Sequence, residues 1–265
     1  MRKYLLTCVV LGFCGGTSYS QEVVEVKKEA PAFVVKFSNL PEEKRKAYGE
    51  HKGKATQFFG QKRTFEALDE VHKGLAIFDE DPSMWNLMGS CHVEFRSFGK
   101  AKKAFQRALA IDGDNTGILF NLAEMDFVTK NWKSCLEKMT ALAAKLEETE
   151  READGEMPIA ILNLHRLAIF KALLSELKLG NEDKAKQLAE EYAVDWDDTP
   201  FTYYSKAALS YSEGDDEEAS RWIVSAVKVF GGLQQVSNWQ DTLIEFGYVK
   251  SFYGGGDEGD IDLAE

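Results

Sequence analysis

The sequence repeats one spacing of bulky and small residues every 34 positions, and this period constrains its fold more than any other feature. The clearest copy starts at position 82, and its defining residues are Trp85, Gly89, Ala101, Phe105 and Ala108. Because these residues recur at steps of three and four, we expect two helices with one apolar stripe each, separated by a break near Gly99. Small side chains at Gly89 and Ala101 would allow the two helices to cross closely. One pair cannot bury both stripes, so we expect pairs to stack on one another.

The same register continues on both sides of this copy. We assign copies to residues 48–81, 82–115, 116–149, 166–199 and 200–232, with starts 34, 34, 50 and 34 residues apart. The longer step contains a charged insertion at 150–165, where we expect the next helix to begin early, near Pro158. Small positions of the later copies are held by Ala185, Ala207 and Ala219. Agreement in register across several copies is a stronger signal than any single copy.

The spacing of Trp85, Met88 and Gly89, continued by Ala101, Phe105 and Ala108, resembles the tetratricopeptide repeat. Two departures are His92, where an aromatic Tyr is usual, and Gly113, where Pro usually follows the second helix. The resemblance covers residues 48–232 and implies an all-α fold, a right-handed α-solenoid of about five helix-turn-helix pairs. It also implies that the first helix of each pair lines a concave groove that holds another protein.

The flanks do not follow the repeat. We interpret residues 21–47 as an N-terminal arm followed by the start of a helix, with residues 21–40 extended. Residues 233–249 have the pattern of an amphipathic helix, which we expect to cap the last apolar face of the stack. Residues 250–265 are rich in glycine and acidic residues and are predicted to be a disordered tail.

The first twenty residues have the pattern of a signal peptide. Arg2 and Lys3 precede an apolar stretch at 4–13, and Ser18 and Ser20 suit cleavage near Ser20. We therefore expect an exported, periplasmic or extracellular protein without a membrane span, since the apolar stretch is too short to cross a bilayer comfortably. A lipid anchor at Cys14 is the less favoured alternative, because bulky Phe13 precedes the cysteine.

Charge is distributed unevenly along the chain, whose formal net charge is −12. Residues 21–107 carry a net charge of +3 and residues 108–265 a net charge of −17. Nucleic acid is therefore not expected as a partner, and an anionic membrane is disfavoured for the C-terminal half. The acidic charge serves either solubility or the attraction of a basic partner.

No motif indicates catalysis, a cofactor or a metal, so we expect a protein that is not an enzyme. Residues 254–259 match G-x-G-x-x-G but follow no strand, and the calcium-like segment starting at Asp112 has Ala123 where a bidentate Glu is needed. The four histidines share no metal-ligand spacing. Cys91 and Cys135 fall at interior helical positions, which favours buried free thiols over a disulfide.

The first-helix positions become apolar and aromatic in the C-terminal half, which favours a groove for an apolar or amphipathic segment of another protein. The predicted groove residues are Phe120, Phe127, Phe170, Leu174, Leu177, Phe201, Tyr204 and Tyr211. The alternative is a groove filled by the protein itself, either by the apolar residues at 33–37 of the arm or by a tightened superhelix. The exposure of Phe127, Phe170 and Tyr204 distinguishes the two.

These observations favour an exported scaffold that binds a protein or peptide. An envelope-assembly lipoprotein subunit is the second interpretation. An enzyme or carbohydrate-binding accessory protein with a site near 147–158 is a third, and it would require a strongly perturbed acid or base there.

Overall fold

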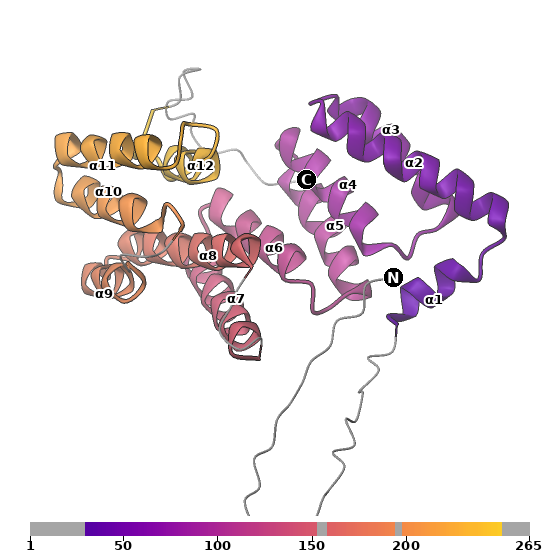
Figure 1. The fold of residues 1–265 in the computed structure, drawn as a ribbon, viewed down its shortest axis with the longest axis horizontal. Helices are drawn as coiled ribbons and strands as arrows, with labels where there is room; N and C mark the ends of the chain where they lie inside the picture. The colour runs from indigo at the N-terminus through magenta and orange to yellow at the C-terminus, as the bar shows by residue number, and fades with distance from the viewer. Residues whose placement is uncertain (1–29, 153–157, 194–197, 251–265) are drawn as a thin grey trace, which may run out of the picture.

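The computed structural model describes residues 30–152, 158–193 and 198–250, and these residues form helices and no strand. The helices pack as a curved stack that runs from α1 to α11, with α12 returning toward its middle (Figure 1). Their bounds are α1 Ala32–Ser38, α2 Glu42–Gly60, α3 Thr64–Ile77, α4 Pro82–Glu94, α5 Phe98–Ile111, α6 Thr116–Val128, α7 Trp132–Glu152, α8 Ile159–Lys178, α9 Glu182–Tyr192, α10 Phe201–Glu213, α11 Asp216–Val229 and α12 Ser237–Phe246.

Each predicted copy contains one pair of consecutive helices, α2–α3, α4–α5, α6–α7, α8–α9 and α10–α11. A residue with positive φ stands in the turn of every pair, at positions 62, 96, 130, 180 and 214. These positions are 34, 34, 50 and 34 residues apart, so the backbone repeats with the same period as the side chains. Three helices extend beyond the predicted copies: α2 begins at Glu42, α7 ends at Glu152, and α8 begins at Ile159, directly after Pro158.

Close helix packing depends on Gly89, as its small size suggests. A Cβ atom at Gly89 would lie 2.3 Å from the ring carbon Cε1 of Phe105, so α4 and α5 touch where no side chain fits. The atoms nearest to Gly89 belong to Phe105, whereas Ala101 packs in a cluster with Phe105 and Met125 of the next pair. Ala101, Ala108, Ala185, Ala207 and Ala219 are completely buried, and Trp85 is partly buried at the edge of the core.

Local sequence explains where several helices begin and end. The Asp81 side chain accepts a hydrogen bond from the Ser83 backbone N–H, while Pro82 takes the first helical position of α4. Asn115 and Asp215 cap α6 and α11 in the same way. Gly214 and Gly247 end α10 and α12 with positive φ, a conformation that glycine adopts without steric cost.

The core is one large C-terminal cluster with smaller N-terminal ones. The large cluster is built from α6 to α12, and the smaller ones lie within α2–α5 and between α5 and α6. α8 is its central helix, because every residue from Ala168 to Glu176 is buried. A helix buried on all sides lies inside a fold, in contrast to the amphipathic helices around it.

The expectation of an extended N-terminal arm is wrong for residues 32–38, which form α1. Pro31 precedes this helix, and its Phe37 ring packs 5.1 Å from the ring of Tyr48 and 5.4 Å from that of Phe78. So short a helix is not stable alone in water, so this contact with the core stabilises it. The signal peptide, the rest of the arm and the predicted disordered tail lie outside the described residues, apart from Lys250.

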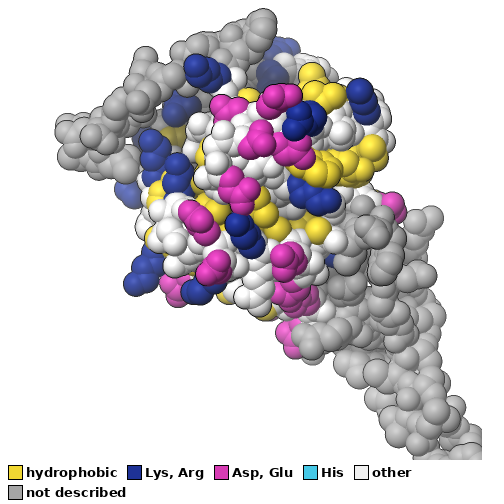
Figure 2. Space-filling view, turned by 90° about the vertical axis from the view of Figure 1, so that its left-hand side faces the viewer, with side chains coloured by type: hydrophobic (Ala, Val, Ile, Leu, Met, Phe, Trp, Pro, Cys, Tyr) yellow, Lys and Arg dark blue, Asp and Glu magenta, His cyan; other side chains and the backbone are white. Residues whose placement is uncertain are grey.

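The predicted capping helix forms, but it lies elsewhere than expected. α12 packs against α8 and not on the outer face of the last pair, where Val224, Val229 and Leu233 remain exposed. Figure 2 looks onto this end of the molecule and shows apolar side chains among charged ones. Within the described ranges, no helix is long and apolar enough to cross a membrane.

Candidate functional site

The first helices of three consecutive pairs, α6, α8 and α10, form a groove that α12 occupies. We call this surface the C-terminal groove. Trp239 of α12 enters it, with its ring 5.4 Å from Phe170, 5.9 Å from Tyr204 and 6.4 Å from Phe201. The Tyr204 hydroxyl donates a hydrogen bond of 3.2 Å to Gln240 Oε1. Burial raises the pKa of this phenol, which therefore stays a donor.

The far end of α12 makes a second set of ring contacts. Phe246 lies 6.3 Å from Phe127 and 5.6 Å from Trp132, and the Lys178 ammonium lies 4.5 Å from its ring centroid. Tyr248, just after α12, stacks on Tyr211 at 5.1 Å. Trp239, Leu243 and Phe246 are spaced by four and three residues, so they form one face of the helix. α12 is therefore an amphipathic helix whose apolar face packs against the groove.

The expectation of an open groove is corrected by this arrangement. Phe127 is 1% exposed, and Phe170 and Tyr204 are 0% exposed. Leu174 and Phe201 are also buried, while Phe120, Leu177 and Tyr211 are partly buried. Of the two alternatives, the groove is filled by the protein itself, and its occupant is α12, not the segment at 33–37. The physical reason is that an aromatic groove and an amphipathic helix on one chain bury each other's apolar surface.

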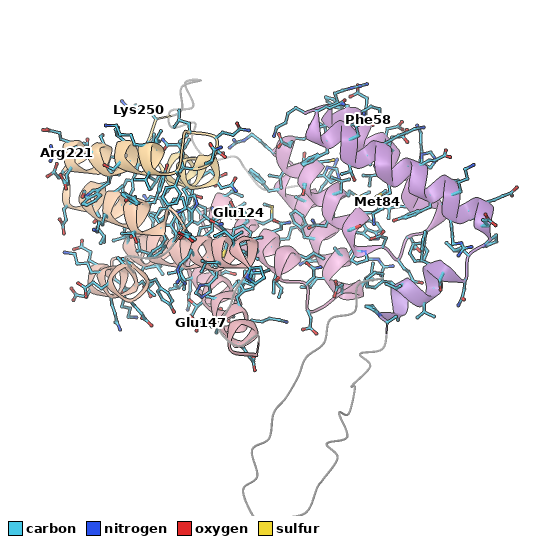
Figure 3. The ribbon with its side chains drawn as sticks, viewed as in Figure 1. Phe58, Met84, Glu124, Glu147, Arg221 and Lys250 are labelled. Atoms are coloured by element: carbon cyan, nitrogen blue, oxygen red, sulfur yellow. The ribbon has the colours of Figure 1, made fainter. Side chains whose placement is uncertain are left out.

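A buried cation lies where α12 crosses the centre of the groove. Lys171 of α8 is 2% exposed, and its ammonium lies 2.9 Å from Glu124 Oε1 of α6 and 3.7 Å from Glu245 Oε2 of α12. The same ammonium lies 4.1 Å from the centroid of the Phe127 ring. Glu124 Oε2 is buried and has no hydrogen-bond partner. Figure 3 labels Glu124 at the centre of the molecule.

Two carboxyl groups thus share one buried cation, and Glu245 is the one that tends to hold a proton. Burial of its carboxyl raises the pKa of Glu245 to about 7; Lys171 opposes this rise, and the negative charges of Glu124 and Asp241 add to it. Although 40% of the Glu245 side chain is exposed, its carboxyl end faces the buried ammonium. A protonated Glu245 can donate a hydrogen bond to Glu124. With that proton, the cluster contains one positive and one negative charge.

Solved structures with a similar backbone are helical-repeat proteins. A tetratricopeptide repeat protein from Parabacteroides merdae superposes with a TM-score of 0.53, with 15% identity over 77% of this chain and 75% of that chain. PilF from Pseudomonas aeruginosa superposes with a TM-score of 0.51, with 14% identity over 78% of this chain and 94% of that chain. The chain has the tetratricopeptide-repeat fold.

Sequence comparison adds nothing to this assignment. No protein-family model matches the chain, and no curated protein sequence matches it. At 14–15% identity, the likeness to the solved tetratricopeptide structures concerns the fold alone. What the groove of this chain does therefore has to be argued from its own residues.

Sequence reasoning missed Lys171 and Glu245. One signal for Lys171 was present, since it stands alone in the run Leu167–Leu174, which is otherwise apolar. A charged residue in such an apolar run is either buried with a partner of opposite charge or lies where the apolar pattern is interrupted. No comparable signal identified Glu245, because an acid on a surface helix is ordinary.

The other candidate features have structural roles in the described residues. Cys91 and Cys135 are free and buried, and burial raises the pKa of each thiol to about 11. In the calcium-like segment, Asn115 caps α6 and donates a hydrogen bond of 3.0 Å to Asp112. Between residues 30 and 250, leaving out the undescribed loops, no group of three potential metal ligands was found.

The N-terminal half of the groove stays open. A depression of about 300 Å³ lies beside α1, α2 and α4, and its lining includes Phe33, Lys52 and Asn86. Asn121 donates a hydrogen bond of 2.9 Å to Asn86 across adjacent pairs. Polar and apolar side chains both line this surface, whereas the aromatic residues predicted from Phe120 onward belong to the part that α12 covers.

Proposed function

We propose that this chain is an exported, non-catalytic scaffold that binds an amphipathic helix of another protein in the C-terminal groove. In the free protein α12 occupies this groove, and the partner helix displaces it. The observation that carries the proposal is the docked α12 itself. A surface that seats one amphipathic helix through ring contacts and one buried cation accepts another with the same pattern.

Imperfect polar contacts support the idea that α12 can be displaced. Glu245 lies 3.7 Å from Lys171, beyond normal hydrogen-bond distance, and Glu124 Oε2 has no hydrogen-bond partner. Buried polar atoms without partners cost free energy. A partner helix that places a hydrogen-bond donor beside Glu124 Oε2 would remove this cost.

The groove also defines the chemistry of the partner helix. Its apolar anchors follow the spacing of Trp239, Leu243 and Phe246, with an aromatic ring at each end. An acidic residue stands directly before the second ring, as Glu245 does, to meet Lys171. Lys178 beside the Phe246 ring favours an electron-rich aromatic at that end over an aliphatic side chain.

The binding experiment uses a labelled peptide of residues 236–250 and fluorescence anisotropy. The full chain with Trp239→Ser and Phe246→Ser has lost its own anchors, so it should bind the peptide. The unchanged chain should bind about 100-fold more weakly, because its tethered α12 competes at a high effective concentration. The matched control peptide has serine at the positions of Trp239 and Phe246, and it should bind neither chain.

A second variant guards against loss of folding in the double mutant. Glu245→Lys keeps every apolar contact but places a like charge beside Lys171, so it should also admit the peptide. If both variants keep their helical circular dichroism and neither binds the native peptide, the groove does not accept a helix in trans and the proposal is wrong.

Export is the second part of the proposal and rests on residues 1–20 alone. Mass spectrometry of the protein from its native host should find an N-terminus at Gln21, directly after Ser20. A lipid on Cys14 would instead support the envelope-assembly lipoprotein, and a retained Met1 would contradict cleavage.

A further inference from the structure

The turns within the helix pairs carry a charge pattern that the groove does not use. Aligned by the repeat, these turns are residues 61–66, 95–100, 129–134, 179–184 and 213–218. The first three contain six Lys or Arg and one acid, whereas the last two contain one Lys and seven acids. The edge formed by the first three turns is therefore basic. We call it the basic edge, and its cations are Lys62, Arg63, Arg96, Lys100, Lys130 and Lys133.

Three of these cations stand where the backbone favours glycine. Lys62, Arg96 and Lys130 have φ values of 59°, 52° and 60°. The residues at the same register of the next two pairs are Gly180 and Gly214, with φ values of 77° and 84°. A residue with a Cβ is less stable than glycine in this region. The basic side chains thus reduce stability at these positions, which points to a role other than folding.

Exposed aromatic rings accompany the charges. Phe65 is 77% exposed, and its ring lies tilted against that of Phe95 of the next pair, with 4.5 Å between the ring centroids. Lys62 reaches Glu94 of the next pair at 3.2 Å, so the first two turns are in contact. Phe98 and Val128 pack on one apolar cluster, which brings the third turn alongside the second.

The opposite edge of the same helices carries acids that are largely paired with cations. The loops between the first pairs carry Asp79, Glu80 and Asp81, and then Asp112 and Asp114, and four of these five acids form ion pairs. The two edges therefore differ in charge, and a negatively charged surface attracts the basic edge more strongly than the opposite one. Such polarity orients the molecule before contact.

We infer that the basic edge docks on the surface of an anionic lipid bilayer. Cations in a row meet lipid phosphates, while an exposed Phe ring enters the boundary between headgroups and acyl chains. An acidic peptide would neutralise the cations but leave the Phe65 ring in water. The contact is peripheral and uses neither the C-terminal groove nor α12.

Vesicle sedimentation tests the inference on the full chain. Phosphatidylcholine vesicles with a minority of phosphatidylglycerol should bind it, and phosphatidylcholine alone should not. The triple variant Lys62→Gly, Arg96→Gly and Lys130→Gly should bind about 100-fold more weakly, at roughly fivefold for each cation. Because glycine suits these φ values, the variant should melt no lower than the unchanged chain, so weaker binding cannot reflect unfolding.

Three controls make the test decisive. Lys44→Gln, Lys46→Gln and Lys54→Gln remove the same charge from exposed positions of α2 outside the basic edge and should leave binding unchanged. Phe65→Ser should weaken binding at constant charge. The Trp239→Ser and Phe246→Ser chain should bind vesicles normally, whatever its peptide binding. Equal binding by the glycine triple variant, or binding to polyglutamate but not to vesicles, would overturn the inference.

Discussion

Gly89 shows how much of this fold depends on single small residues. A methyl group at Gly89 would overlap the buried Phe105 ring, since the nearest ring carbon would lie 2.3 Å from the methyl carbon. Phe105 cannot move away without disturbing Ala101 and Met125, with which it forms a cluster. The crossing of α4 and α5 therefore tolerates glycine and no larger residue.

We predict that Gly89→Ala lowers the free energy of unfolding by about 1–3 kcal/mol, because it overpacks the core. The matched control is Gly53→Ala in α2, where nothing lies within 4 Å of an added Cβ. That change should raise the free energy by about 0.5–1 kcal/mol through helix propensity alone. Urea unfolding measures both, and effects of the same sign would contradict the packing argument.

The pKa values of the buried carboxyl groups shift in opposite directions, according to their surroundings. Asp126 is 2% exposed; although burial opposes it, hydrogen bonds and charges from Lys138, Ser134 and Lys102 lower the pKa of its carboxyl. Burial also raises the pKa of Glu245, and there the single ammonium of Lys171 does not outweigh burial and the charge of Glu124. The balance between burial and the hydrogen bonds and charges that face the carboxylate decides the direction at each site.

At the scale of the element, α12 is held by contacts whose strength depends on pH. Because the pKa of Glu245 rises from 4.5 to about 7 on docking, the docked state holds a proton that the undocked state releases. The stability that this proton gives to the docked state is fully present below about pH 4.5 and is lost as the pH rises through about 7. Asp126 has the opposite effect: the stability that its carboxylate gives is lost as the pH falls, and only at lower pH, since its pKa lies below 3.8.

We therefore predict that the docking of α12 weakens between about pH 5 and pH 8. The measurement is the pH dependence of unfolding for the unchanged chain minus that for Glu245→Gln, whose amide does not titrate. Taking the difference cancels other groups in this range, such as His92, whose pKa is lowered. Parallel pH profiles for the two chains would show that Glu245 does not carry the dependence.

The placement of α12 also explains the apolar face that remains at the end of the stack. Val224, Val229 and Leu233 stay exposed because the helix that follows them enters the groove instead. Trp239, Leu243 and Phe246 are buried against the aromatic groove, and burial of their apolar surface stabilises the helix in this position.

At the scale of the molecule, contacts are local along the stack. α8 and α12 belong to the C-terminal cluster, whereas α2, α3 and α4 share a separate one. In repeat proteins each pair contacts its neighbours alone, so a perturbation loses its effect over a few pairs. α1 contributes no buried residue, and α8 contributes more than its neighbours.

We predict from this organisation that Trp239→Ser with Phe246→Ser raises amide hydrogen exchange in α6–α11 but not in α2–α3. The reciprocal variant, Val71→Ala in the N-terminal cluster, should raise exchange in α2–α4 and leave α8 protected. Hydrogen exchange followed by mass spectrometry resolves these segments. A uniform rise in both variants would mean that the stack unfolds as one cooperative unit.

Periodicity was sufficient to predict the helix pairs, because the pairing of helices depends on residues within one copy. Gly89, Phe105 and the buried alanines lie within 34 residues of their contacts, so their spacing records those contacts. The charges of the turns are also visible in the sequence. The left-handed backbone conformation at Lys62, Arg96 and Lys130 could not be predicted, because none of these residues is glycine.

The sequence by itself determined the helical pairs, their register and the aromatic character of the C-terminal first helices. Only the tertiary structure decided that α12 covers those aromatics, that Lys171 lies beneath it, and that residues 32–38 form a helix against Tyr48. An amphipathic pattern shows that a segment has an apolar face but not which distant surface covers it. That choice depends on the competition between all available apolar surfaces, and it exists only once the chain has folded.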